Sequence, residues 1–171
     1  MVSPARPATQ NSQPAMTENA PLALYQDHVQ SDWIDYNGHM SEGYYAIAFG
    51  NATDKLMDRI GMDAPFRERL RFTIYTMETH ISYLLEMAEG EPLSVTTQML
   101  EYDDKRMRIF HAMERQGAIV TATQEAVLLN VDMQGPKAVP FDAEVMARIE
   151  AIGRAHAGLP WHPQAGRAIA L

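Results

Sequence analysis

The most regular pattern of apolar positions runs from residue 41 to residue 61. Five apolar residues recur there at steps of four, three, four and four: Tyr45, Phe49, Ala52, Leu56 and Ile60. That spacing puts all five on one face of an α-helix. Polar residues occupy the opposite face: Asn51, Asp54, Lys55 and Asp58. Ser41 suits the N-cap of this helix, and Gly61 suits the residue that ends it.

Two glycines, Gly43 and Gly50, lie inside the predicted helix. Each costs about 1 kcal/mol of helix stability relative to alanine. Either the helix tolerates this cost, or the small residues serve close packing where a sheet wraps around the helix.

The pattern changes to a period of two after residue 71. Four segments alternate between the two faces of a strand: 72–87, 93–102, 106–115 and 118–133. Turns of a few residues connect them, which is typical of hairpins between long antiparallel strands. A shorter strand is predicted at 24–30. A last helix is predicted at 142–156, with Asp142 as its N-cap.

These elements predict an α+β fold with one long helix, a five-stranded antiparallel sheet and a C-terminal helix. The first 20 residues are rich in Pro, Ser, Gln and Asn and lack the continuous apolar stretch of a signal peptide. We expect a disordered tail over residues 1–20, with Met16 as an alternative start. We expect a single domain over residues 21–171.

The composition excludes several partners and chemistries. A net charge of -8 argues against a nucleic-acid-binding face and against binding to anionic membranes. The chain has no cysteine, which rules out disulfides, thiolate nucleophiles and cysteine-bound metals. The six histidines show no tight ligand spacing, so we expect neither a metal site nor a cofactor. Because no apolar run is long enough to cross a bilayer, we expect a cytoplasmic protein.

Residues 35–45, "DYNGHM" followed shortly by "YY", resemble a family signature. The signature is D-x-x-G-H-[MV]-N-N-x-x-Y of the hotdog acyl-CoA thioesterases of the 4-hydroxybenzoyl-CoA type. Four residues occupy its positions: Asp35, Gly38, His39 and Tyr45. Ser41 and Glu42 replace its two asparagines, which weakens any role of those side chains but not of their backbone N–H groups.

Five longer segments resemble the betainyl-CoA thioesterases of carnitine degradation, which occur alone or fused to L-carnitine dehydrogenase. The segments are "DWIDYNGHM", "METHISYLLEMAEGEPL", "YDDKRMRIFHAM", "LLNVDM" and "AGLPWHPQAGRAI". The resemblance implies a hotdog fold, in which the sheet wraps a long central helix, and an acyl-CoA substrate. It also implies a homodimer or a dimer of dimers, because a hotdog protomer has an exposed sheet edge, and pairing removes such an edge.

By this resemblance, Asp35 attacks the thioester carbonyl or activates a water molecule to do so. Backbone N–H groups near Ser41 or Glu42, at the helix start, would hold the developing oxyanion. The catalytic candidates are Asp35, Asn37, His39, Ser41 and Glu42. The candidates for substrate binding are Trp33, Tyr36, Gly38, Tyr44, Tyr45, Glu78 and His80. The aromatic rings among them suit a trimethylammonium group, as in betaine.

The candidates in the turn also have ordinary structural roles. Asp35 suits an Asx turn, and Asn37-Gly38 is a common turn dipeptide. Ser41 lacks the surroundings of a serine nucleophile, which favours the N-cap role. His39 either packs at the helix start or orients Asp35 or a water molecule.

Other functions stay open. Hotdog hydratases carry D-x-N-P-x-H, which "DYNGH" does not match. A non-catalytic acyl-CoA-binding or scaffolding protein is the third possibility, although the presence of Asp35 argues against it. Glu78 and His80 share one strand face, where they either contact substrate or form a polar pair at the solvent or at a dimer interface.

Overall fold

The structure, a computed structural model, describes residues 20–169. Within this range, strands form one curled antiparallel sheet in the order β1-β3-β4-β5-β2, with β6 paired to β5. The strands are β1 (Leu22–His28), β2 (Phe72–Tyr83), β3 (Pro92–Tyr102), β4 (Arg106–Arg115), β5 (Ile119–Asp132) and β6 (Lys137–Ala138). The helices are α1 (Glu42–Ile60), α2 (Ala64–Leu70) and α3 (Ala143–His156), with a 3-10 turn, η1, at Ser31–Trp33. All of the predicted tail except Ala20 lies outside the described residues.

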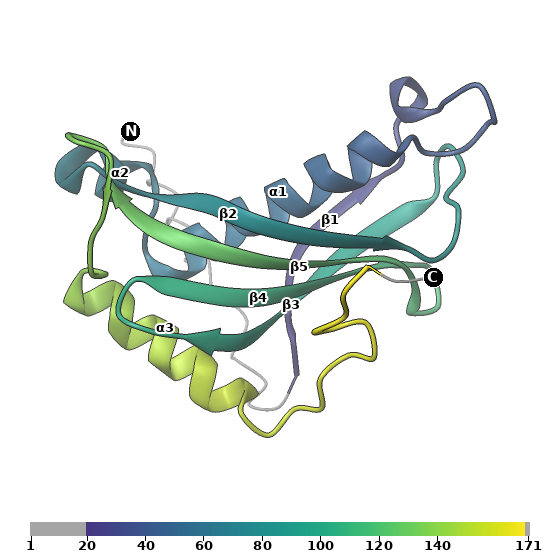
Figure 1. The fold of residues 1–171 in the computed structure, drawn as a ribbon. Coiled ribbons are helices and arrows are strands. Elements are labelled where there is room, and N and C mark those ends of the chain that lie inside the picture. The colour runs from purple at the N-terminus through teal and green to yellow at the C-terminus, as the bar shows by residue number, and fades with distance from the viewer. Residues whose placement is uncertain (1–19, 170–171) are drawn as a thin grey trace, which may run out of the picture.

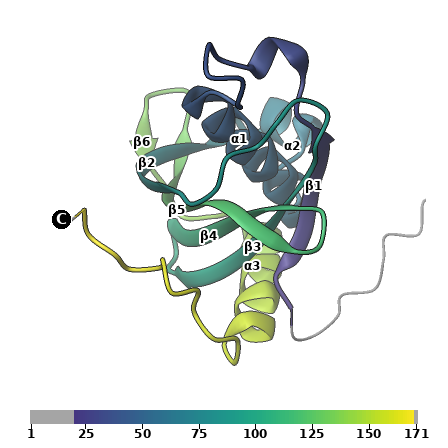
Figure 2. The same cartoon turned by 90° about the vertical axis from the view of Figure 1, so that its right-hand side faces the viewer.

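Helix α1 lies along the concave side of the sheet, with the edge strands β1 and β2 on either side of it (Figures 1 and 2). The predicted apolar face of α1 is buried over its whole length: Tyr45, Phe49, Ala52, Leu56 and Ile60. Its first half packs in one cluster with Val95 and Met113. Its second half packs in another cluster with Met107 of β4, Leu128 of β5 and Ile149 of α3. The apolar face of α1 therefore packs against the concave side of the sheet along the whole helix.

A buried histidine interrupts this apolar layer. His111 on β4 is fully buried and stacks on Phe49 of α1, with ring centroids 5.9 Å apart. Its Nε2 lies 3.1 Å from the Thr53 hydroxyl on α1, and its Nδ1 lies 2.8 Å from the Thr97 hydroxyl on β3. Burial lowers the pKa of His111 to about 3, so the ring is neutral at physiological pH. The imidazole thus ties the helix to two strands.

The long elements follow the sequence prediction, with shifted ends. Strand β1 begins at Leu22 rather than at residue 24, and β2 ends at Tyr83 rather than at residue 87. The two glycines within α1 are exposed, and a Cβ at Gly43 or Gly50 would meet no atom within 4 Å. Close packing against the sheet of the same protomer is therefore not the reason for these glycines.

The sequence analysis missed three short elements: η1, α2 and β6. Asp63 caps α2 by accepting a hydrogen bond of 3.0 Å from the Phe66 backbone N–H, and Pro65 stands in the first turn. Arg71 ends the helix in the left-handed region at φ 60°. The two-residue strand β6 adds a sixth strand to the predicted five, at the end of β5.

Asp142 is the N-cap of α3, as predicted, and its side chain accepts a hydrogen bond of 3.0 Å from the Glu144 backbone N–H. After α3 the chain turns back across the convex side of the sheet, drawn in yellow in Figure 1. We call residues 157–169 the C-terminal segment. Among the described residues, no helix combines the length and apolar character needed to span a membrane.

Candidate active site

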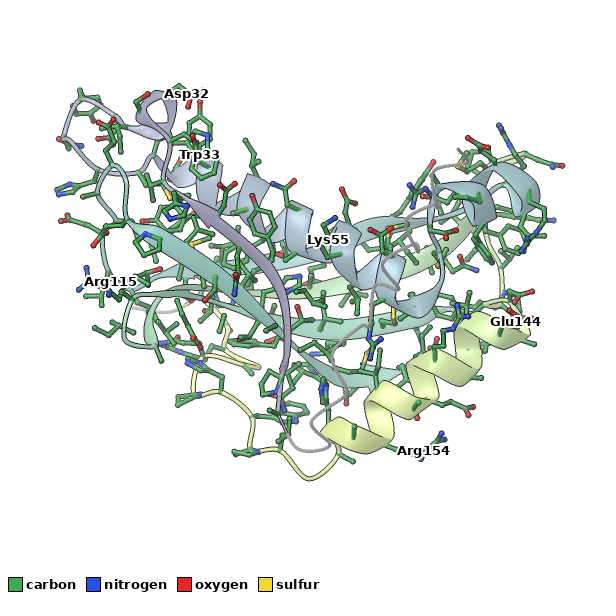
Figure 3. The ribbon with its side chains drawn as sticks, turned by 180° about the vertical axis from the view of Figure 1, so that it is seen from behind. Asp32, Trp33, Lys55, Arg115, Glu144 and Arg154 are labelled. Atoms are coloured by element: carbon green, nitrogen blue, oxygen red, sulfur yellow. The ribbon has the colours of Figure 1, made fainter. Side chains whose placement is uncertain are left out.

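The loop between β1 and α1 forms a tight hairpin ahead of the helix. Ile34 and Met40 pair as an isolated antiparallel bridge. Inside it, the Asp35 N–H donates to the His39 carbonyl at 2.9 Å, and the Gly38 N–H donates to the Asp35 carbonyl at 3.0 Å. Gly38 adopts φ 83°, a left-handed conformation that favours glycine. Figure 3 shows the beginning of this loop, at Asp32 and Trp33, over one end of the molecule.

Asp35 forms the Asx turn that its position suggests. Its carboxylate accepts a hydrogen bond of 2.7 Å from the Asn37 backbone N–H, and the Asn37 side-chain amide lies 3.4 Å from its second oxygen. An ionised carboxylate has about four lone-pair positions, so these bonds leave capacity for a substrate or a water molecule. Asp35 is only partly exposed. The turn therefore holds this carboxylate in a defined orientation and leaves some of its lone pairs free to accept further hydrogen bonds.

The hairpin is tied directly to the start of α1. The Ser41 N–H donates to the Trp33 carbonyl at 2.9 Å, and the Tyr44 N–H donates to the Ser41 carbonyl at 3.0 Å. Ser41 has the extended backbone of an N-cap, but its side chain makes no cap hydrogen bond. Because the Ser41 N–H is already engaged, the donors left at this helix start are the N–H groups of Glu42 and Gly43, which find no backbone acceptor within residues 20–169.

His39 contacts a residue that the sequence analysis did not single out. Its Nε2 lies 3.3 Å from the Glu86 carboxylate, in the loop between β2 and β3. The same loop is tied to the hairpin by the Met40 N–H, which donates to the Met87 carbonyl at 2.8 Å. Both side chains in the pair are substantially exposed. The structure thus brings a second loop, with its own carboxylate, to the predicted site.

Aromatic rings flank the start of α1. Trp33 stacks on Tyr44 at 5.5 Å, and Tyr45 meets Tyr83 edge to face at 5.4 Å. The Tyr83 hydroxyl donates to the Glu42 carbonyl at 3.4 Å, and burial together with the charge of Glu42 raises the Tyr83 pKa. Burial likewise raises the pKa of Tyr45. Tyr83, at the end of β2, is a further member that the sequence analysis missed.

Three predicted substrate-binding residues do not pack with the others. Tyr36 lies in the hairpin, but it projects into solvent and is 96% exposed. Glu78 and His80 stand on the convex side of the sheet, where they line a pocket of about 360 Å³ together with Arg108 and Glu125. Alternate residues of β2, such as Ile81, face α1 instead. Within one protomer, Glu78 and His80 are thus separated from Asp35 by the sheet.

The remaining predicted residues lie in one continuous stretch of the chain. The hairpin and the first turn of α1 contain Trp33, Asp35, Asn37, Gly38, His39, Ser41, Glu42, Tyr44 and Tyr45. Within residues 20–169, no group of three or more His, Asp or Glu side chains is placed to hold a metal ion. The arrangement supplies a fixed carboxylate, an imidazole paired with a second carboxylate, and helix N–H groups suited to a developing negative charge.

The chain belongs to the thioesterase-like superfamily, whose sequence profile matches residues 29–149. Its sheet, curled around α1, has the hotdog architecture of solved thioesterases. A putative thioesterase from Pseudomonas putida is 38% identical, covers 89% of this chain and 97% of its own, and superposes with a TM-score of 0.78. A hypothetical protein from Staphylococcus aureus, solved in complex with CoA, is 25% identical, covers 93% of this chain and 99% of its own, and gives a TM-score of 0.83.

Curated relatives are more specific in name. The betainyl-CoA thioesterase of Pseudomonas aeruginosa is 40% identical over 151 residues, which are 88% of this chain and 95% of that protein. An L-carnitine dehydrogenase/betainyl-CoA thioesterase of Agrobacterium fabrum is also 40% identical, over 88% of this chain. The match spans only 31% of that longer protein. The family and fold predicted from the sequence are thereby confirmed.

Proposed function

We propose that the protein hydrolyses betainyl-CoA to betaine and CoA, with Asp35 and the start of α1 as the catalytic centre. The substrate follows from the relative named betainyl-CoA thioesterase, whose similarity extends over 88% of this chain. The observation that carries the mechanism is the Ser41 to Trp33 backbone hydrogen bond of 2.9 Å, which fixes the hairpin bearing Asp35 against the helix start. A carboxylate and free N–H donors then approach one carbonyl from different sides.

In this mechanism the thioester oxygen binds at the N–H groups of Glu42 and Gly43. Negative charge develops on that oxygen during attack, and the helix start stabilises it. Asp35 either forms a mixed anhydride and expels the CoA thiolate, or removes a proton from the attacking water. Water completes the first route by hydrolysing the anhydride. Both routes release a carboxylic acid and CoA, and both need the Asp35 carboxylate.

The betainyl group carries a trimethylammonium cation that offers no N–H donor. Such a cation is recognised by aromatic faces and by negative charge, with about 0.5–2 kcal/mol for each aromatic contact. Trp33 with Tyr44, and Tyr45 with Tyr83, provide rings beside the helix start. Glu86 adds a carboxylate on the neighbouring loop. We propose that these four aromatic rings and the Glu86 carboxylate recognise the trimethylammonium cation of the acyl group.

We also propose that the protein is a homodimer that acts in the cytoplasm, where CoA thioesters are produced and consumed. Strand β2, with 12 residues, is an edge strand of the sheet as the structure describes it, so one of its sides has no strand partner. Exposed apolar side chains lie on β2, at Tyr75 and Met77, and on α1, at Ile47. A second copy paired along β2 would cover them and would give Gly43 and Gly50 a close neighbour.

The test is thiol release from betainyl-CoA, compared with acetyl-CoA, isovaleryl-CoA and the neutral isostere 3,3-dimethylbutanoyl-CoA. The chain has no cysteine, so it adds no background with a thiol reagent. We expect betainyl-CoA to be preferred over its isostere in kcat/KM. Equal turnover of neutral acyl groups would leave a thioesterase with another substrate. Tight binding without turnover of any thioester would contradict the enzymatic proposal.

A further inference from the structure

The middle of β2 is exposed on both faces of the sheet. Five consecutive residues, 75–79, have exposed side chains. Successive side chains of a strand point to opposite faces, so a continuous run of this kind leaves both faces uncovered. The other edge strand, β1, has only single exposed residues, each beside more buried neighbours. The middle of β2 is therefore the least covered part of the two sheet edges.

The second half of β2 offers a regular edge to a further strand. Within residues 20–169, β2 pairs with β5 on one side and with no strand on the other (Figure 1). A bulge interrupts the register with β5 just before Glu78, and residues 78–83 then pair without a break. Glu78 and His80 line the pocket of about 360 Å³ on the convex side. Thr79, between them, pairs with Ala126 of the core and points to the concave side.

Glu78 and His80 have no polar partner within the protomer. Among the described residues, neither side chain makes a hydrogen bond or an ion pair. The carboxylate opposite His80 on β5 is Glu125, which accepts hydrogen bonds of 2.6 Å from the Arg108 guanidinium and from the Gly166 N–H of the C-terminal segment. A carboxylate and an imidazole on one face of the edge strand are therefore left to interact with a second chain.

A second copy of β2 can pair only in registers that a two-fold axis allows. In an antiparallel pair of identical strands, the residue at the axis faces its own copy, and the residues before and after it face each other. An axis through Glu78 sets two carboxylates opposite each other, and an axis through His80 does the same for two imidazoles. An axis through Thr79 instead sets each Glu78 opposite the partner's His80. No other axis puts either group opposite a charged residue of β2.

We propose that two copies of the protein pair along β2 about a two-fold axis at Thr79, with the Glu78 carboxylate of each protomer opposite the partner's His80. This inference rests on the homodimer proposed above and specifies its register. A carboxylate accepts a hydrogen bond from an imidazole N–H, whereas two carboxylates facing each other across a strand pair repel. Symmetry forms the contact twice, and the pairing covers the exposed residues in the middle of β2.

A single introduced cysteine reports the register directly, because the chain has no cysteine of its own. In Thr79→Cys the two thiols face each other at the axis, where opposed Cα atoms are about 4.5–5.5 Å apart and within reach of a disulfide. Oxidised glutathione should convert this variant to a covalent dimer on a non-reducing gel. Glu78→Cys and His80→Cys are the matched controls. Their thiols are separated by a diagonal of about 7–8 Å in this register, so they should cross-link at least about tenfold more slowly.

Exchange of the two residues tests the contact itself. His80→Glu sets carboxylates opposite each other, and the dissociation constant of the dimer should rise at least about tenfold. The double variant Glu78→His/His80→Glu restores both contacts with the groups exchanged, and its dissociation constant should return to within about threefold of the wild-type value. In both variants the new carboxylate lies beside Glu125. The difference between them therefore reports only the contact across the axis.

The outcomes separate this register from the other proposals. None of the readouts uses turnover, so a failure of the proposed hydrolysis does not affect them. A monomeric wild type in sedimentation velocity overturns the homodimer and its register together. A dimeric wild type in which Glu78→Cys or His80→Cys cross-links fastest, or in which no variant cross-links, overturns the register and leaves the homodimer standing. A double variant that dissociates as readily as His80→Glu overturns the contact between Glu78 and the partner's His80.

Discussion

The imidazole of His39 lies 3.3 Å from the carboxylate of Glu86, although the two residues belong to different loops. Because the two side chains are 41% and 75% exposed, a contact of this kind contributes little to stability, about 0–1 kcal/mol. Its consequence is orientation. Glu86 limits the directions that the His39 ring takes, and in the proposed site it adds negative charge near the acyl group.

Glu86→Gln tests this orientation. We expect folding to be unchanged and kcat/KM for betainyl-CoA to fall about threefold to tenfold, in line with a weak, exposed pair. In the double variant with His39→Gln, kcat/KM should fall by less than the product of the two single effects. Each single substitution already removes the same His39–Glu86 contact. Strictly multiplicative effects would mean that the two side chains act separately.

Asp35→Asn tests the proposed centre itself. The asparagine side-chain oxygen still accepts from the Asn37 N–H, so the hairpin should keep its shape. Turnover should fall roughly a hundredfold to ten-thousandfold, because the new side chain neither attacks a carbonyl nor takes a proton at neutral pH. Asp32→Asn, a matched change on an exposed residue in the same loop, should keep most activity. Near-full activity in Asp35→Asn would remove this carboxylate from the mechanism.

Trp33→Leu tests recognition of the acyl cation. The substitution keeps an apolar side chain and removes the ring that stacks on Tyr44. The preference for betainyl-CoA over 3,3-dimethylbutanoyl-CoA should fall by a factor of about 2 to 30, the equivalent of one cation–π contact. Tyr36→Leu, at a ring that is 96% exposed in the protomer, is the comparison. A ratio that changes only in Tyr36→Leu would move the cation site away from Trp33.

The buried His111 predicts a loss of stability in acid. Its folded pKa is about 3, below the ordinary value of 6.5, so the unfolded chain binds this proton more tightly. The resulting stability is fully present above pH 6.5 and is lost as the pH falls toward 3. Between pH 7 and pH 5 the loss should be about 2 kcal/mol in the free energy of unfolding.

Urea unfolding at several pH values measures this loss. Burial also lowers the pKa values of His156 and His162, so the wild-type slope contains two further contributions of the same sign. His111→Gln keeps hydrogen-bonding groups in the core and removes only the proton linkage of residue 111. Its unfolding free energy should depend less on pH than that of the wild type. Equal slopes would show that His111 is not the titrating group.

Met77→Glu tests the proposed dimer. Met77 on β2 is 58% exposed in the protomer, and a carboxylate there would be buried without a partner in an interface along β2. Sedimentation velocity should show a dimer for the wild type and a monomer for the variant. Lys55→Glu, on the solvent face of α1, should stay dimeric. A monomeric wild type would refute the assembly directly.

The sequence predicts most clearly what depends on spacing within one element. The buried face of α1 follows from a 3.6-residue period, and the hairpins follow from a period of two with short turns. Helix α2 is less predictable, because seven residues carry too little periodicity and its ends depend on the Asp63 cap and on Arg71. A search for caps before a proline at the first turn would have found it.

The site shows the same division between local and long-range information. The Asp35 to Asn37 turn joins residues two apart, and their sequence alone suggests it. Tyr83 reaches the helix start, and Glu86 reaches the hairpin, only because β2 runs along the whole edge of the sheet and ends beside α1. No pattern around either residue indicates this meeting. The positions of Glu78 and His80 follow from the register of β2 with β5, which places His80 opposite Glu125.

The hydrogen bonds of His111 have a further consequence for the reacting groups. The imidazole engages Thr53 on α1 and Thr97 on β3, so α1 cannot slide along the sheet by one turn without breaking this linkage. The N–H groups at the start of the helix are thus set at their height above the strands by a polar anchor in the middle of the core. A conservative change at Thr97, in the middle of the core, becomes a way to displace the proposed oxyanion donors relative to the sheet.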